Sequence, residues 1–375
     1  MPIKTLQIIS SALLLYASSI AFGFDQIPVS VIYSPPERHK TADEALTSGH
    51  VREENFPMAA PASKPWRIAF LFPHIKDPYW VGCDYGVISE AKRLGISVDI
   101  LPSTGYDDLV GQMRNMDQAI AKRYDAIVIS PISQTANNSS IARARAHGIP
   151  VFELANDSTS DKLNIKVTSS LKGMGSAAMQ WVIRDAKKRG LKSVNVALLP
   201  GPADAGWVKG EVEGSREAAD HAPIKVNIVN ILYGDSDLVE QSRLAARLLT
   251  EQRKKLDYIL GCTGCAPAAV LPVRMAGLEG KVRIVAFDLT REIAEQIQKG
   301  YIKAAADTKG VSQARIVTDA AVNYLEGRGQ KFPSTILVKL GLLDQENFAD
   351  YDFGSSIAPA HFDPVLSFDP GAHPR

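Results

Sequence analysis

Hydrophobic positions become regularly spaced along this chain from about residue 66 onward. Short apolar runs predict strands at residues 68–72, 97–101, 125–130 and 150–154. Stretches with apolar positions three or four residues apart predict helices between them, at residues 81–94, 107–122 and 139–147. Unbroken apolar strands that alternate with helices are typical of a parallel sheet covered on both faces. We therefore predict a doubly wound lobe over residues 66–156.

A second series of the same kind follows. The pattern predicts helices at 174–188, 208–221, 238–252, 266–275 and 291–298, and strands at 194–199, 226–232, 258–261, 282–287 and 303–306. We assign residues 157–306 to a second lobe. The helix at 312–325 lies in a segment, 307–330, that returns to the first lobe, and residues 331–343 carry a final strand. The fold class is therefore α/β, with two doubly wound parallel-sheet lobes and a cleft between them.

The two ends of the chain lack this regularity. Lys4, the apolar stretch 8–20 and the small residues around Ala21-Phe22-Gly23 are typical of a signal peptide over residues 1–23, which predicts a periplasmic protein. A retained N-terminal anchor is the alternative. Residues 24–65 contain several prolines and no sustained period, so we expect an extended lead segment, and residues 344–375 predict an irregular tail.

Charge and composition narrow the choice of partners. Lys plus Arg (42) nearly balance Asp plus Glu (41), which gives a formal net charge of +1. A protein of this charge has no basic footprint for nucleic acid or for an anionic membrane surface. No later stretch is apolar for long enough to predict a membrane span after signal cleavage. We expect a small-molecule ligand, bound at a local site.

Signals of catalysis are weak. The chain has no Gly-x-Ser-x-Gly elbow and no Walker loop, and its seven histidines show no paired metal spacing. Gly173-Met174-Gly175 loosely matches a dinucleotide fingerprint but lacks the acidic residue at a later strand end. Cys262 and Cys265 either close a small disulfide loop or form the redox pair of an exported oxidoreductase. We predict no cofactor and no enzymatic activity.

Candidate ligand-binding residues follow the predicted strands, because ligands of open α/β sheets bind at the carboxyl ends of the strands. An Asp in such a position is also a common helix N-cap, so this alternative stays open for the acidic members. The candidates are Asp77, Tyr79, Trp80, Asn156, Trp207, Lys209, Thr263, Asp288 and Asp307.

Four stretches resemble the type I periplasmic binding proteins, the fold of ribose-binding proteins, and within them the TorT family. They are Lys76-Asp77-Pro78-Tyr79-Trp80 and the segments 149–156, 199–206 and 212–214, and the similarity extends over residues 66–327. The resemblance implies a receptor that binds trimethylamine N-oxide and then associates with the periplasmic domain of a TorS-type sensor histidine kinase. Aromatic faces suit a methylated cationic nitrogen, at roughly 0.5–2 kcal/mol per contact.

Two positions depart from the TorT pattern. Thr168-Ser169-Ser170 stands where a Trp is expected, and Asp288 stands where a Tyr is expected. An Asp there accepts hydrogen bonds from sugar hydroxyls in ribose-type proteins, and it also balances a cationic ligand. The ligand therefore stays open between an N-oxide or methylamine and a sugar or polyol, and an ABC permease is the alternative partner to the kinase.

Overall fold

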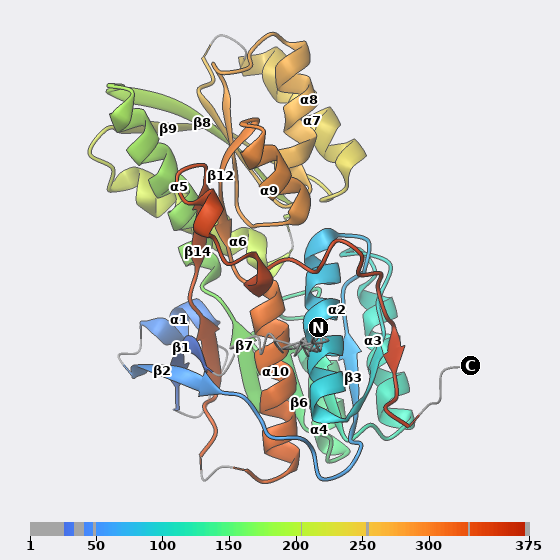
Figure 1. Ribbon diagram of the computed structural model, residues 1–375. Helices are drawn as coiled ribbons and strands as arrows, with labels where there is room; N and C mark the ends of the chain where they lie inside the picture. Colours follow the sequence, from blue (N-terminus) through green and yellow to red (C-terminus); the bar gives the residue numbers. More distant parts are fainter. Residues whose placement is uncertain are drawn as a thin grey trace, which may run out of the picture.

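Two α/β lobes meet at a narrow waist in the computed structural model (Figure 1). The structure describes residues 26–33, 41–47, 50–203, 205–252, 255–328 and 331–371. The predicted signal peptide, residues 1–23, lies outside the described residues.

The sheet of the first lobe has nine strands among the described residues, in the order β15-β4-β3-β5-β6-β7-β13-β1-β2. Its six central strands are parallel: β4 (Ser97–Ile100), β3 (Arg67–Leu71), β5 (Ala126–Ile129), β6 (Val151–Leu154), β7 (Ile165–Thr168) and β13 (Thr335–Val338). The outer strands β15 (Ser367–Phe368), β1 (Gln26–Ile32) and β2 (Val51–Pro57) pair antiparallel.

Helices cover both faces of this sheet, as the alternating pattern predicts. On one face α2 (Pro78–Leu94) packs against α10 (Gly310–Leu325), and their apolar side chains share a core with Phe70 and Phe152. On the other face lie α3 (Leu109–Ala121) and α4 (Asn138–Ala146), whose core includes Leu71 and Ile127.

The second lobe repeats the plan with a six-stranded sheet in the described residues, in the order β14-β12-β11-β10-β8-β9. Its strands are β8 (Ser193–Gly201), β9 (Lys225–Tyr233), β10 (Tyr258–Gly261), β11 (Arg283–Ala286), β12 (Ile302–Asp307) and the antiparallel β14 (Gly341–Asp344). Helices α5 (Leu171–Lys188) and α6 (Gly206–Asp220) cover one face. Helices α7 (Leu238–Gln252), α8 (Cys265–Met275) and α9 (Arg291–Gln298) cover the other.

The structure corrects four of the predictions about segments of the chain. The lead segment carries β1, β2 and α1 (Ala42–Leu46), since Pro28 and the short, half-polar runs hid its alternation. Strand β7 belongs to the first lobe, not the second, and its buried Lys166 made it look polar. The final strand is two strands, β13 and β14, one in each sheet. The tail is partly regular, with β15 and two 3₁₀ turns, η1 (Phe348–Asp350) and η2 (Phe353–Ser355).

The chain passes between the lobes at residues 169–170, 308–309 and 339–340, and a fourth time through the tail. Ser169 joins the first three passages: its Oγ lies 2.9 Å from the carbonyl oxygens of both Thr308 and Val338 and also accepts from Gln313 Nε2. Because a hydroxyl has one proton, it donates to one of these carbonyls at a time. The three passages therefore lie side by side within hydrogen-bonding distance of the Ser169 hydroxyl.

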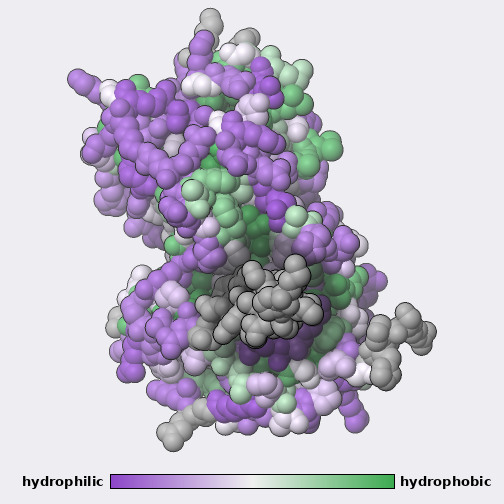
Figure 2. Space-filling model, in the orientation of Figure 1, coloured by the Kyte–Doolittle hydropathy of each residue, from purple (hydrophilic) through white to green (hydrophobic). Residues whose placement is uncertain are grey.

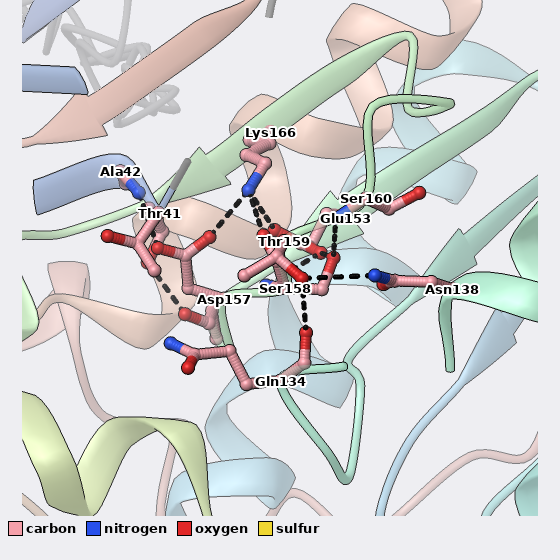
Figure 3. A network of polar contacts seen from close by, with 12 residues as sticks. Thr41, Ala42, Gln134, Asn138, Glu153, Asp157, Ser158, Thr159, Ser160 and Lys166 are labelled. Carbon is pink, nitrogen blue, oxygen red and sulfur yellow. Dashed lines mark hydrogen bonds and ion pairs between the residues drawn. The ribbon is translucent and has the colours of Figure 1, made fainter. Parts of the chain in front are cut away.

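A buried polar network supports the first lobe next to the waist (Figure 3). Lys166 Nζ lies 2.7 Å from Asp157 Oδ1 and 3.6 Å from Glu153 Oε1, and it donates to the Ser158 carbonyl. Asp157 Oδ2 in turn accepts from the backbone nitrogen of Ala42, the first residue of α1, at 2.5 Å. All three ionisable side chains are buried, and burial raises the pKa of Glu153 to about 8. Removal of one member would leave the others without a partner in the interior.

Among the residues that the structure describes, none of the helices combines the length and the apolar composition that crossing a bilayer requires.

Candidate functional site

A cavity of about 60 Å³ lies between the lobes, at the carboxyl ends of the parallel strands. It adjoins the point in each sheet where the strand order reverses, β3 beside β5 in the first lobe and β8 beside β10 in the second. Figure 2 shows hydrophobic residues gathered at this waist between largely hydrophilic lobe surfaces. The cavity is lined by Asp77, Tyr79, Trp80, Tyr106, Ala155, Asn156, Leu171, Met174, Trp207, Glu211, Ser236, Thr263, Asp288, Thr308 and Gln313.

Helix α2 begins at the cavity wall. Asp77 is its N-cap, and Asp77 Oδ1 accepts from the backbone nitrogen of Tyr79 at 2.8 Å. Pro78 suits the first helical position because its missing N–H has no partner to lose there. This start fixes Tyr79 and Trp80 in the first turn, where both line the cavity. The other oxygen of Asp77 accepts from Thr263 Oγ1, 3.0 Å away in the second lobe, and so links the lobes.

Aromatic rings form a continuous series from one lobe to the other. Centroid distances are 5.2 Å for Tyr79 to Trp80, 6.3 Å for Trp80 to His74, 5.5 Å for His74 to Tyr106 and 5.9 Å for Tyr106 to Trp207. Burial lowers the pKa of His74 to about 4, so this ring is neutral and packs as an apolar group.

Trp207 takes its place because of the turn before it. Gly201 has φ +109°, and a Cβ there would lie 2.5 Å from the Trp207 ring. The glycine therefore permits the ring to lie over the end of β8. On the first-lobe side, the Asn156 amide donates to Tyr106 Oη at 3.1 Å and to the Pro131 carbonyl at 3.0 Å. These contacts orient Tyr106 toward Trp207.

Asp288 is a buried carboxyl group at the end of β11. It accepts from the backbone nitrogens of Leu289 and Thr308 and, at 2.6 Å, from Thr308 Oγ1. Burial raises its pKa to about 7, and the nearby charge of Asp307 adds to the shift. Asp288 thus ties the end of β11 to the second passage between the lobes while it lines the cavity.

Glu211 and Gln313 each present a polar atom without a partner. Glu211 is 1% exposed, its Oε2 has no hydrogen bond, and burial followed by the charge of Asp288 raises its pKa. Gln313 is also 1% exposed. Its Nε2 donates to the Thr308 carbonyl and to Ser169 Oγ, which leaves Oε1 unpaired. A buried polar atom without a partner costs free energy, so both atoms need one from a ligand or from water.

The comparisons with known proteins agree with this architecture. The model of the periplasmic binding protein domain family matches residues 68–329. The chain belongs to this family.

Relatives of this periplasmic binding protein include the periplasmic protein TorT and a sugar-binding protein. It is 29% identical over 307 residues to the periplasmic protein TorT of Escherichia coli K12, which covers 82% of this chain and 86% of TorT. It is 26% identical over 267 residues to the D-allose-binding periplasmic protein of the same strain, covering 67% of this chain and 83% of that protein.

Solved structures share the fold. A solute-binding protein of an ABC transporter from Bradyrhizobium sp. BTAi1, with bound bis-tris, has a TM-score of 0.75 and 31% identity, covering 91% of this chain and 98% of that one. TorT in its complex with the TorS sensor domain, without ligand, has a TM-score of 0.72 and 24% identity, covering 80% of this chain and 100% of that one. At that identity the second likeness concerns the fold alone.

In this periplasmic binding protein, seven of the nine candidates from the sequence line the cavity: Asp77, Tyr79, Trp80, Asn156, Trp207, Thr263 and Asp288. Lys209 does not. It is two residues beyond Trp207 on α6, which turns it to the opposite face of the helix, and its largely exposed side chain lies near Glu213.

Asp307 does not line the cavity either. It is 1% exposed and accepts from Tyr351 Oη, Ser356 Oγ and the backbone nitrogen of Lys309. Lys309 has a left-handed backbone, with φ 60°, at the second passage between the lobes. Asp307 therefore holds this turn and the tail in place, a structural role that its position after a strand did not reveal.

Sequence reasoning missed Tyr106, Glu211, Thr308 and Gln313. A ring next to Gly105, after the second strand, was the available signal for Tyr106. Glu211 lies one helical turn after Trp207, beside the buried Val208 and Val212, so a carboxyl group on the apolar face of α6 was the signal there. Thr308 and Gln313 depend on how the chain returns to the first lobe, and no local pattern predicts that.

The structure gives a structural role to the cysteine pair and to the glycine motif that the sequence analysis considered for redox and nucleotide chemistry. Cys262 and Cys265 form a disulfide whose residues are 1% and 0% exposed, and thiol exchange needs an accessible sulfur. Gly175 lies within α5, where a Cβ would be 2.1 Å from the Glu211 carbonyl oxygen, so this glycine permits close packing of α5 on α6. Among the described residues, no group of three metal-binding side chains occurs.

Proposed function

We propose that this chain is a periplasmic receptor whose lobes close on a small methylated nitrogen compound, trimethylamine N-oxide or a related methylamine. In this proposal the closed form signals to the periplasmic domain of a TorS-type sensor histidine kinase. The observation that carries the proposal is the series of rings that both lobes contribute to one small cavity, with Tyr106 and Trp207 in contact across it.

The size of the cavity supports a very small ligand. A water molecule needs roughly 10–15 Å³ of such volume, so about 60 Å³ accommodates roughly four or five water-sized groups. A nitrogen with three methyl groups has this size, whereas a pentose requires a wider cleft. Flat aromatic faces are also the usual partners of methylated cationic nitrogen.

Signalling follows from closure in this proposal. Contacts between the lobes, such as Thr263 to Asp77, are made only when the cleft is narrow. A ligand that binds both walls therefore favours the closed population, and a partner that reads the outer surface responds to it. The similarity to TorT supports a kinase partner.

A second candidate function is delivery of a sugar or polyol to an ABC permease. Asp288 at the cavity wall and the similarity to the D-allose-binding protein favour it. The bis-tris-bound relative, a transport protein by its description, is compatible with either function because bis-tris combines an amine with hydroxyl groups.

Isothermal calorimetry tests the proposal. Residues 24–375 are titrated with trimethylamine N-oxide, trimethylammonium chloride and ribose, in parallel with Trp80→Ala and, because Trp80 is buried, with Trp207→Ala as a second variant. Binding of a methylated compound that either variant weakens, together with compaction in small-angle scattering, supports the receptor. Heat from ribose alone favours transport. A TorS-type periplasmic domain that co-sediments only with the ligand-bound or only with the free protein supports the kinase partner.

A further inference from the structure

The polar groups around the cavity are unequally divided between hydrogen-bond acceptors and donors. Three carboxyl groups line it, those of Asp77, Glu211 and Asp288, and none of its described lining residues is Lys, Arg or His. A cavity with several acidic groups and no basic one has a negative potential when any of them is ionised.

Most donors around the cavity are already used within the protein. Thr263 Oγ1 donates to Asp77 and Thr308 Oγ1 to Asp288. The amide nitrogen of Asn156 donates to Tyr106 and Pro131, and that of Gln313 to Thr308 and Ser169. One donor of the wall has no partner within the protein, the buried Trp207 Nε1–H, so a ligand meets this donor unpaired.

Unpaired acceptors, in contrast, are present and buried. Glu211 Oε2 and Gln313 Oε1 have no hydrogen-bond partner, and each residue is 1% exposed. Glu211 comes from α6 in the second lobe and Gln313 from α10 in the first. An N–H group of a ligand would satisfy the Gln313 oxygen directly. Burial raises the pKa of Glu211, and a bound cation would favour the ionised form of this carboxyl group, which accepts from the N–H.

We propose that the cavity selects a small methylated ammonium ion that carries an N–H group, with its methyl groups against the rings and its N–H toward Glu211 or Gln313. This inference rests on the proposed function and specifies its ligand class. An N-oxide has the opposite requirement, because its oxygen accepts hydrogen bonds, and the wall offers it one unpaired donor, Trp207 Nε1, against the two unpaired oxygens that an N–H group can use. Tetramethylammonium has the charge and the methyl groups but no N–H.

The test is calorimetry on residues 24–375 with three probes, trimethylammonium chloride, tetramethylammonium chloride and trimethylamine N-oxide, at about pH 8. The proposal expects trimethylammonium to bind at least about tenfold more tightly than either of the others, as a hydrogen bond to a charged donor implies. Glu211→Gln removes the ionisable carboxyl group at nearly constant shape, so a bound cation can no longer be paired with an ionised Glu211. The variant should bind trimethylammonium about tenfold or more weakly.

Two further variants make the test specific. Gln313→Met removes the second unpaired oxygen and should also weaken the binding of trimethylammonium. It replaces Glu211→Gln in the test if circular dichroism shows that the Glu211→Gln variant does not fold. Glu213→Gln, the same substitution on the exposed face of α6, should have no effect.

The outcomes separate this inference from the proposed function. Tighter binding of the N-oxide, or unchanged trimethylammonium affinity in both Glu211→Gln and Gln313→Met, overturns the inference and leaves the methylated-compound receptor standing. Equal binding of tetramethylammonium and trimethylammonium overturns the role of the N–H. Absence of heat with all three probes overturns both.

Discussion

Tyr106 of the first lobe and Trp207 of the second lie ring to ring, with centroids 5.9 Å apart at an interplanar angle of 61°. The contact joins a loop after β4 to the first turn of α6, two segments that a cleft opening would separate. Each ring therefore lines the cavity and also takes part in the contact between the two lobes.

Removal of the Trp207 ring should weaken the binding of a methylated ligand. Trp207→Ala takes away one aromatic face, worth roughly 0.5–2 kcal/mol, so the dissociation constant should rise about twofold to thirtyfold. Calorimetry measures this change. Lys209→Ala on the same helix is the matched control, because Lys209 points away from the cavity and should leave affinity unchanged. Equal effects of the two substitutions would contradict the site.

The hydrogen bond between Thr263 and Asp77 should favour closure. Thr263→Val keeps the shape of the side chain and removes the hydroxyl donor, at a cost of about 0.5–1.5 kcal/mol to the closed form. The ligand-free variant should then be more open in small-angle scattering and bind ligand several-fold more weakly. We expect the ligand-free variant to have a larger radius of gyration than the parent, and ligand to return it to the parent's value. An unchanged scattering curve together with unchanged affinity would contradict a role of this hydrogen bond in closure.

Binding of trimethylammonium should tighten as pH rises. Burial raises the pKa of Asp288 to about 7, so in the free protein this carboxyl group is protonated below that value. A bound cation favours its ionised form, and binding below about pH 7 must therefore release a proton. Affinity should increase between about pH 6 and pH 8, with proton release detectable in buffers of different ionisation enthalpy.

The titratable groups near Asp288 do not reverse the expected increase of affinity with pH. They are Asp307, Glu211, Tyr79, Cys83 and Tyr351, all with raised pKa values, and burial is the largest cause for each. If affinity falls over the same range, the carboxyl groups act as protonated donors instead, which is what an N-oxide would require.

Asp84 should make stability depend on pH. It lies buried in α2, where its Oδ2 accepts from the Val365 backbone nitrogen at 2.8 Å, and burial raises its pKa to about 7. Between about pH 4 and pH 7 the unfolded chain loses this proton while the folded chain keeps it, so stability is full at low pH and falls by up to about 4 kcal/mol as pH rises.

Asp84→Asn should remove that dependence. The stability of the variant relative to the natural protein should increase from about pH 5 to about pH 8 in urea denaturation, since an amide does not ionise and its oxygen still accepts from Val365. Asp117→Asn, at an exposed position, serves as the control. A difference that stays constant with pH would show that Asp84 is ionised in the folded protein.

Lys166 should be essential for the stability of the first lobe. Lys166→Met leaves the buried Glu153 and Asp157 without their cation, which costs about 3–5 kcal/mol. Adding Asp157→Asn should recover part of the loss, because it removes the buried carboxyl group that lies nearest to Lys166 Nζ, at 2.7 Å, whereas burial raises the pKa of Glu153 to about 8. Thermal denaturation of the single and the double variant measures these changes in stability. A Lys166→Met protein as stable as the parent would contradict the stabilising role of Lys166.

The fold could be predicted largely from local patterns. Runs such as Phe70 to Phe72 followed by an amphipathic stretch ending at Gly95 identify strand and helix without tertiary information. Strand β7 could not be recognised, because its buried Lys166 is compensated by carboxyl groups at 153 and 157 that only the fold brings together.

The site was predictable wherever it follows a parallel strand directly, as for Trp80, Trp207 and Thr263. The rule failed for Lys209, where helical phase decides which residue faces the cavity, and for Asp307, where partners in the tail use the carboxyl group. Glu211 and Gln313 lie within helices, so their approach to one cavity depends on how two lobes pack.

Strand β1 pairs with β13, so that Val29 lies opposite Val338 although almost the whole chain separates them. The second lobe is inserted between these partners. In vectorial synthesis and export, all of its strands except the edge strand β14 emerge before α10 and β13, and both of its helical layers are present by then. The first lobe, with the N-terminal hairpin, must wait for residues near 338. A chain truncated before that point would therefore keep a foldable second lobe and leave β1 and β2 without the strand on which they dock.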